Sequence, residues 1–139
     1  MIAGVGVDIV DIARLKAALA RTPGLAERLF TEAEQVAVRA RHTPADSLAG
    51  CFAAKEALAK VLGAPAGLRW TDAEVLRSGN GRPFIAVRGT VADAARAAGI
   101  GAWHLSLSHD GGFCVAVVVA EDVPSGPDDV SGRPERGER

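Results

Sequence analysis

The sequence predicts an α+β fold in which an antiparallel sheet packs against one long central helix. Three observations predict this class. The chain opens on a β-branched run punctuated by glycine, the strongest helical pattern lies in the middle, and two pairs of β-rich runs joined by tight turns follow. Tight turns join antiparallel strands, and helices segregated from hairpins are typical of α+β domains rather than of doubly wound parallel sheets.

The N-terminal third predicts one strand followed by short helices. Residues 2–10 are rich in Val and Ile and suit a buried strand. From about Asp11 the apolar residues recur at helical spacing, and Thr22-Pro23-Gly24 ends that helix. A short helical turn is expected over residues 25–30. The capping-box pattern Thr31-Glu32-Ala33-Glu34 then starts another helix.

The central helix is predicted over residues 44–63. Its apolar residues recur at spacings of three or four, and Asp46 or Ser47 is the expected N-cap. Gly63 suits the first position beyond the helix, and Pro65 prevents its continuation.

Two hairpins and one more helix complete the predicted domain. Residues 73–77 and 83–87 are expected to pair across Ser78-Gly79-Asn80-Gly81, and residues 90–98 form an alanine-rich helix. Residues 103–108 and 113–120 are expected to pair around Asp110-Gly111-Gly112. We therefore expect one domain over residues 1–122. Residues 123–139, rich in Pro, Gly, Ser and charge, are expected to be a disordered tail.

Composition excludes several classes of protein. The 139 residues include 16 Lys and Arg against 17 Asp and Glu, which argues against a general nucleic-acid binder. Aromatic residues are 4% of the chain, too few for a base-stacking platform. No run approaches the roughly 18 apolar residues of a membrane span. Cys51 and Cys114 fit no metal-binding or disulfide spacing, so we expect buried thiols and a cytoplasmic location.

Asp8 is the first candidate functional residue, because a carboxylate inside an apolar strand is costly unless it is paired or binds a cation. One interpretation is that Asp8 caps the helix that follows. The other pairs it with Glu56, on the polar stripe of the central helix. Two carboxylates from separate elements make a reasonable Mg²⁺ site, since this ion often takes only one or two protein ligands.

Lys60 lies four residues after Glu56 on the same helix face, in the orientation that favours an ion pair. Such a pair is often only a solvated surface contact. Here Phe52, Glu56 and Lys60 share a stripe between apolar residues, so partial burial is the alternative. A helix face with a metal-binding acid and a lysine would suit a pyrophosphate bridged by Mg²⁺.

Three further motifs each have a structural and a functional interpretation. Ser108-His109-Asp110 cannot form a catalytic triad, because neighbours in a strand point to opposite faces. His109 is then structural, or a phosphate or ribose contact. Gly79-Asn80-Gly81-Arg82-Pro83 is a hairpin turn whose N–H groups and Arg82 could also hold a nucleotide. Gly4-x-Gly6 lacks the third glycine of a dinucleotide fingerprint.

Basic residues recur every seven positions near the N-terminus, at Arg14, Arg21 and Arg28. On a continuous helix they would share one face, although Pro23-Gly24 interrupts that continuity. They form either a solvated face or a basic strip that docks an acidic helix of a partner.

Two motifs together resemble a known family. Val5-Gly6-Val7-Asp8-Ile9, followed about 45 residues later by Phe52-Ala53-Ala54-Lys55-Glu56-Ala57-Leu58-Ala59-Lys60, is similar to the paired signature of the 4′-phosphopantetheinyl transferases. The chain length, Asn80-Gly81-Arg82-Pro83, and the segment of residues 105–110 resemble the small single-domain subgroup, the holo-acyl-carrier-protein synthases. The resemblance covers roughly residues 2–122.

The resemblance implies a fold, a reaction and an assembly. The reaction moves the 4′-phosphopantetheine arm of coenzyme A onto a serine of apo acyl carrier protein in fatty-acid or polyketide synthesis, releasing adenosine 3′,5′-bisphosphate. The fold would be that of the family. The chain would form homotrimers with active sites at subunit interfaces, and would use neither nucleic acid nor membrane.

The resemblance also implies roles for individual residues. Asp8 and Glu56 would bind Mg²⁺, and Lys60 would neutralise charge on the phosphate oxygens. The catalytic set would be completed by His109. The coenzyme A contacts and the carrier-protein contacts would come from the following residues: Lys55, Lys60, Gly81, Arg82, Pro83 and His109 for coenzyme A, and Arg14, Arg21 and Arg28 for the carrier protein.

The sequence departs from the family pattern at Cys51, where the family often has a basic residue. One contact to the nucleotide phosphate is therefore expected to be lost or supplied elsewhere. An alternative from another class is a binding module that recognises a carrier protein or a nucleotide without transfer, although docking alone would not require two acids and Lys60.

Overall fold

A computed structural model describes residues 1–124 of the chain. The expected tail, apart from its first two residues, lies outside the described residues. The elements are, in order, β1 (Ile2–Asp11), α1 (Ile12–Arg21), α2 (Leu25–Leu29), α3 (Glu32–Arg39), α4 (Pro44–Val61), the 3₁₀ turn η1 (Trp70–Asp72), β2 (Ala73–Arg77), β3 (Pro83–Val87), α5 (Gly89–Ala97), β4 (Ile100–Asp110) and β5 (Phe113–Asp122).

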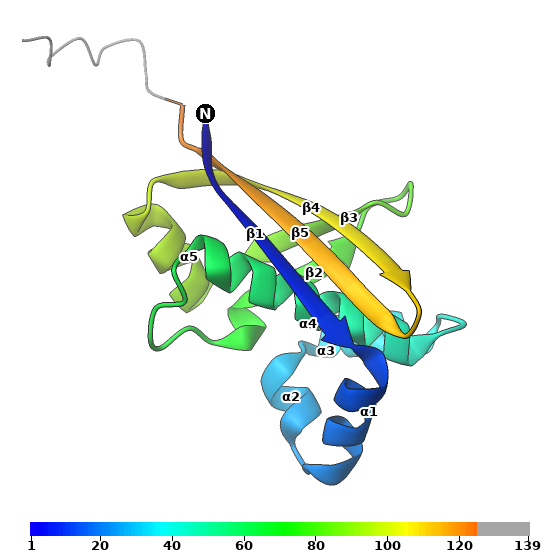
Figure 1. The fold of residues 1–139 in the computed structure, drawn as a ribbon. Coiled ribbons are helices and arrows are strands. Elements are labelled where there is room, and N and C mark those ends of the chain that lie inside the picture. Colours follow the sequence, from blue (N-terminus) through cyan, green and yellow to red (C-terminus); the bar gives the residue numbers. More distant parts are fainter. Residues whose placement is uncertain (125–139) are drawn as a thin grey trace, which may run out of the picture.

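The strands form two antiparallel sheets (Figure 1). In the larger sheet β5 lies between β1 and β4, so the first and last strands of the described chain are neighbours. The strands β2 and β3 form a separate hairpin. Both predicted hairpins are confirmed, and Gly111 and Gly112 close the β4–β5 turn with φ of 58° and 84°, values that favour glycine.

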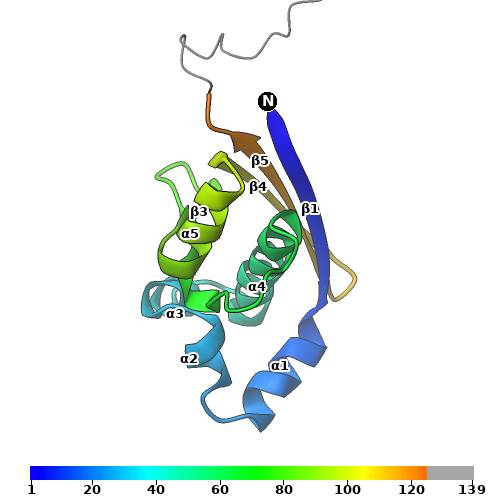
Figure 2. The same cartoon turned by 90° about the vertical axis from the view of Figure 1, so that its left-hand side faces the viewer.

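The long helix α4 packs against one face of the larger sheet, as Figure 2 shows, and the β2–β3 hairpin contacts both α4 and strand β4. The predicted α+β class is thus confirmed. Alanines dominate the buried side of α4, with Ala49, Ala53, Ala54 and Ala57 fully buried. Small side chains allow helix and sheet to approach closely.

The closest approach of β1 to α4 occurs at Gly6. A β-carbon placed there would lie 2.0 Å from the carbonyl oxygen of Ala57 and 3.0 Å from Cγ2 of Val61. Only glycine fits this contact. The glycines near the N-terminus therefore serve helix–strand packing two residues before Asp8.

The two ends of α4 correct one expectation and confirm another. Neither Asp46 nor Ser47 caps α4, because the helix begins earlier, at Pro44, and Thr43 is the N-cap residue without a side-chain hydrogen bond. Proline suits the first turn because it lacks an N–H group that would need a partner. The predicted C-terminal end is confirmed, since Gly63 follows the helix with φ of 75°.

The outer face of the larger sheet carries exposed aliphatic residues. In β1, Val5, Val7 and Ile9 are 62%, 53% and 62% exposed. They pair with Val119, Val117 and Val115 of β5. No described helix or strand covers this face in Figure 1 or Figure 2. Such a contiguous apolar surface is typical of a protein–protein interface. Separately, none of the helices in residues 1–124 is both long and apolar enough to cross a membrane.

Candidate active site

Asp8 lies on the inner face of β1, which faces α4, and its side chain is only 15% exposed. Lys60 of α4 reaches across to it, with its Nζ 3.0 Å from the Asp8 carboxylate and 2.9 Å from the carbonyl oxygen of Val7. The interpretation of Asp8 as a helix cap is wrong. Asp11 caps α1 instead, by accepting a hydrogen bond of 3.1 Å from the backbone N–H of Arg14.

Glu56 lies one helical turn before Lys60, but Lys60 forms its ion pair with Asp8 rather than with Glu56. Partial burial and the negative charge of Asp8 raise the pKa of the Glu56 carboxyl, while Lys60 opposes this shift. A partly buried carboxylate beside a second negative charge forms an environment that a cation relieves. Asp8, Glu56 and Lys60 are therefore one electrostatic cluster.

The donor set of this cluster fits Mg²⁺ better than a transition metal. Asp8 and Glu56 supply hard carboxylate oxygens, and in the described part of the chain no group of three or more His, Cys, Asp or Glu side chains gathers at one point. Mg²⁺ commonly binds one or two carboxylates and keeps water and substrate phosphate as its other ligands. Zinc would require a fuller set of protein ligands.

A cavity of about 640 Å³ opens beside the two carboxylates. Asp8 and Glu56 form part of its wall, and Arg14 of α1 lies on its rim. The remaining wall is largely apolar: Phe52 of α4 is joined by Leu15 of α1, Leu25 and Leu29 of α2, and Phe113 of β5. The sequence placed Phe52 beside Glu56 but did not identify the other four, although an aromatic directly after Gly111-Gly112 was a usable signal.

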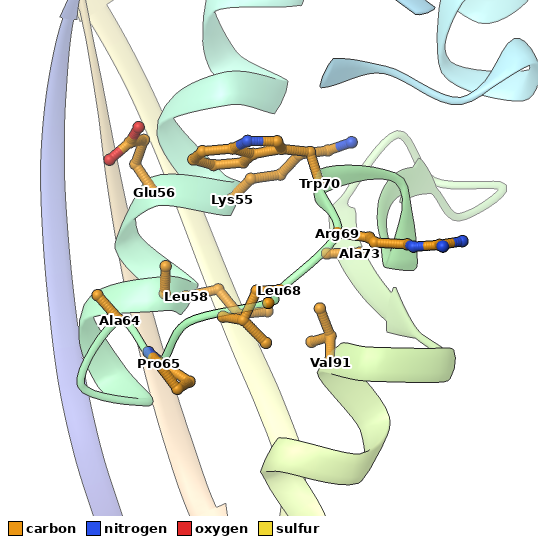
Figure 3. Close-up of a pocket in the computed structure, with 12 residues that line it drawn as sticks. Lys55, Glu56, Leu58, Ala64, Pro65, Leu68, Arg69, Trp70, Ala73 and Val91 are labelled. Atoms are coloured by element: carbon orange, nitrogen blue, oxygen red, sulfur yellow. The ribbon is translucent and has the colours of Figure 1, made fainter. Parts of the chain in front are cut away.

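A second cavity, of about 300 Å³, lies on the other side of Glu56 (Figure 3). Its wall combines the C-terminal half of α4 with the loop that leads to Trp70. The Trp70 ring packs against Phe52, with 5.4 Å between ring centroids. Glu56 thus stands on the ridge between two cavities, where a ligand held at the acids can extend to either side.

Lys55, next to Glu56, points away from it (Figure 3) and is 2% exposed. Its Nζ donates hydrogen bonds of 2.6 Å to Glu34 and 2.7 Å to the carbonyl oxygen of Leu29. It also lies 5.6 Å from the ring centre of Phe30. Lys55 also lines the 300 Å³ cavity beside Glu56, although its ammonium is bonded to Glu34 and Leu29, so its contact with a nucleotide stays a prediction.

The structure does not bring His109 to the Asp8–Glu56 cavity within one chain. His109 pairs with Cys114 and lines a different cavity with the first turns of α1 and α4. Asp8 of β1 pairs with Ala116 of β5, whereas His109 of β4 pairs with Cys114 of β5. Asp8 and His109 are therefore two strands apart and offset by two residues, which corresponds to about 12 Å between their α-carbons. As predicted, Ser108, His109 and Asp110 alternate between faces and form no triad.

The turn with Gly81, Arg82 and Pro83 closes the β2–β3 hairpin, on a sheet other than the one that carries Asp8. Asn80 holds this turn by accepting a hydrogen bond of 3.1 Å from the backbone N–H of Arg82. It does not line the Asp8–Glu56 cavity. Of the predicted coenzyme A contacts, His109 and the Gly81-Arg82-Pro83 turn therefore lie apart from the predicted metal acids, whereas Lys60 lies at Asp8.

The three arginines of the predicted basic strip are all exposed. Arg14 and Arg21 belong to α1, whereas Arg28 belongs to α2, since Gly24 with φ of 79° separates the helices. Both helices wall the Asp8–Glu56 cavity. Of the three arginines, Arg14 lines this cavity, whereas Arg21 and Arg28 lie on the same two helices outside its lining. Cys51, the departure from the family pattern, is buried beside Glu34 and not at the surface.

Comparison with known proteins gives a consistent result. A family model described as the 4′-phosphopantetheinyl transferase superfamily matches residues 4–118. The holo-[acyl-carrier-protein] synthase of Frankia alni is 58% identical over 120 residues, which cover 86% of this chain and 98% of that protein.

Solved structures agree with the family model. The crystal structure of holo-[acyl-carrier-protein] synthase from Neisseria meningitidis has a TM-score of 0.76 at 30% identity, covering 88% of this chain and all of that one. The Helicobacter pylori enzyme in complex with coenzyme A has a TM-score of 0.73 at 32% identity, covering 84% and 99%. With matches over nearly all of its described length, the chain belongs to the holo-[acyl-carrier-protein] synthases of the 4′-phosphopantetheinyl transferase superfamily.

Proposed function

We propose that the Asp8–Glu56 cavity is where this chain performs the reaction of its family, with Mg²⁺ held by the two carboxylates. The reaction itself is the transfer of 4′-phosphopantetheine from coenzyme A to a serine of acyl carrier protein. The observation that carries the site assignment is the cluster of Asp8, Glu56 and Lys60 at the wall of a 640 Å³ cavity. A binding module without catalysis would not need this arrangement.

Bound Mg²⁺ would supply positive charge to the diphosphate of coenzyme A and orient it beside the acids. Lys60, whose ammonium already lies at Asp8, is placed to neutralise negative charge on the phosphate oxygens as it develops. The side chain is 53% exposed and keeps its mobility for this role. The apolar wall excludes water that would otherwise compete with the serine hydroxyl.

The transfer exchanges one phosphorus–oxygen bond for another. The serine oxygen forms a bond to the phosphorus next to pantetheine, and the bond from that phosphorus to the bridging oxygen breaks. Adenosine 3′,5′-bisphosphate leaves with the bond's electron pair, and the hydroxyl proton passes to solvent. Positioning and charge neutralisation dominate such reactions, which agrees with a site holding two acids and a lysine rather than a covalent nucleophile.

We further propose that three copies assemble through the apolar outer face of the larger sheet. The exposed row of Val5, Val7 and Ile9 supports this assembly. So does the separation of His109 and the Gly81-Arg82-Pro83 turn from the acids within one chain. In the proposed trimer, those residues hold the nucleotide half of coenzyme A bound at a neighbour's acids, while Arg14, Arg21 and Arg28 receive the acidic carrier protein.

We also propose a cytoplasmic location, in which Cys51 and Cys114 stay reduced. Both are buried free thiols, which fits a reducing compartment.

The deciding experiment is a transfer assay on a panel of apo carrier proteins with coenzyme A and Mg²⁺. We expect holo carrier protein, measured as the added mass of one phosphopantetheine, and its loss when EDTA removes the metal. Glu56→Gln should lose most turnover and remain folded by circular dichroism. Near-normal turnover of that variant would remove Glu56 from the metal site. Light scattering tests the trimer, which Val7→Lys should dissociate.

A further inference from the structure

The deepest polar network of the described chain joins four elements through Glu34 and Lys55. Lys55 of α4 and Glu34 of α3 form an ion pair of 2.6 Å with both side chains almost fully buried. Glu34 also accepts hydrogen bonds of 2.9 Å from the backbone N–H groups of Thr31 and Val75. In the described chain, no buried polar atom of these two side chains lacks a hydrogen-bond partner.

The second bond of the Lys55 ammonium goes to the end of α2. Its acceptor is the carbonyl oxygen of Leu29, the last residue of that helix, at 2.7 Å. A cation at a helix C-terminus satisfies carbonyl groups that have no partner within the helix. Since α2 has only five residues, it depends on contacts outside the helix, and this bond is one of them.

The segment that Lys55 holds borders the active site from the carrier-protein side. Leu25 and Leu29 wall the cavity at Asp8 and Glu56, and Arg28 precedes the carbonyl that Lys55 binds. Glu34 fixes the other side of the same junction, because its carboxylate closes the capping box with Thr31. The pair thus clamps residues 29–31 to α4, one residue before Glu56.

We propose that the buried Lys55–Glu34 pair is a positioning device for carrier-protein recognition, setting the α2 surface at the correct distance from the metal acids. Lys55 then acts through α2 and does not touch coenzyme A. This inference rests on the proposed function for the docking role of α1 and α2. It assigns Lys55 differently from the family resemblance, which implies a nucleotide contact.

The test compares the two substrates. We expect Lys55→Met to raise the KM for apo carrier protein about tenfold or more, since small displacements of a positioning element are costly. The KM for coenzyme A should stay within about twofold of the wild-type value. Arg96→Met, which removes a charge from the exposed end of α5, is the matched control and should change neither constant.

A single substitution leaves a buried charge without its partner and can unfold the chain. The double variant Lys55→Met/Glu34→Gln removes both charges at similar volume, so it should restore the melting temperature but not the KM for the carrier protein. If KM for coenzyme A rises instead, Lys55 binds the nucleotide and the inference is wrong. If the folded double variant has wild-type constants for both substrates, the pair only stabilises the fold and the inference is equally wrong. Absence of transfer in the wild type would instead contradict the proposed function.

Discussion

Replacing Gly6 by alanine tests whether the placement of Asp8 against Glu56 depends on the contact between β1 and α4. A β-carbon at this position would lie 2.0 Å from the carbonyl oxygen of Ala57. Carbon and oxygen atoms in proteins approach no closer than about 3.3 Å. Strand and helix must therefore separate locally by about 1.3 Å.

This separation predicts two measurable losses. Overpacking in a core costs about 1–3 kcal/mol, which lowers the melting temperature of a domain this size by roughly 3–15 °C. Asp8 lies two residues further along the same face of β1. A displacement of about 1 Å at a reacting centre can cost up to 100-fold in rate, so we expect turnover at saturating substrate to fall between tenfold and 100-fold.

Differential scanning fluorimetry and the transfer assay with an Mg²⁺ titration measure both quantities. Gly4→Ala is the matched control, because its β-carbon would lie 3.0 Å from Cγ1 of Val61 and 3.8 Å from the nearest backbone oxygen, a much smaller overlap than at Gly6. We expect Gly4→Ala to retain most activity. Wild-type turnover and Mg²⁺ dependence in a folded Gly6→Ala variant would refute the view that this contact positions the acids.

Three other predictions concern the thiols, a loop carboxylate and the basic strip. Burial, helped by the negative charge of Glu34, raises the pKa of the Cys51 thiol to about 12. Iodoacetamide at pH 8 should therefore label Cys51 only after denaturation. Rapid labelling of the native protein would contradict this. Asp72 accepts hydrogen bonds from the N–H and hydroxyl of Thr90, which lower the pKa of Asp72. Asp72→Ala should therefore lower the free energy of unfolding by about 1 kcal/mol at pH 7, measured by urea unfolding. This loss should shrink below about pH 4, because the wild-type carboxyl becomes protonated there. A loss that does not depend on pH would argue against a charged acceptor at Asp72. Arg14→Glu should raise the KM for carrier protein, and this difference from the wild type should shrink in high salt. A change in KM that does not depend on salt would contradict docking by charge.

Local signals in the sequence were sufficient for most elements. The Thr31–Glu34 capping box forms as predicted, and Gly63 and Gly111-Gly112 end α4 and turn the last hairpin. These features depend on a few neighbouring residues whose hydrogen bonds or φ values have only one good solution. The same reasoning identified Asp8 as a carboxylate that is costly in an apolar strand, and Glu56 on the polar stripe of the central helix as its companion.

Tertiary contacts decided what the local pattern left open. The spacing of Glu56 and Lys60 favoured an ion pair on one helix, yet the Lys60 side chain reaches Asp8 on β1, where it also finds the Val7 carbonyl. An ion pair between residues four apart on a helix contributes only a few tenths of a kcal/mol, so the two contacts of Lys60 with β1 outweigh it. Nothing in the local pattern predicts that Lys55 is buried, and only the position of Glu34, 21 residues earlier, explains its burial.

The division into two sheets was also beyond the local pattern. Each hairpin is specified by its own turn, but nothing in a turn says whether one hairpin continues the sheet of the other. Strands β4 and β5 complete a sheet with β1, whereas β2 and β3 form their own two-stranded sheet, which packs against α4 and β4 without joining the larger one.

The alanine-lined helix α4 has a consequence for how this enzyme fails on heating. Glu56 and Lys60 project from the most buried helix of the described chain, and Asp8 from the strand locked against it at Gly6. Amide groups in such a place exchange with solvent only when the whole domain opens. The geometry of the acids is therefore retained until cooperative unfolding, and activity should disappear within the narrow temperature range of the melting transition rather than decline gradually below it.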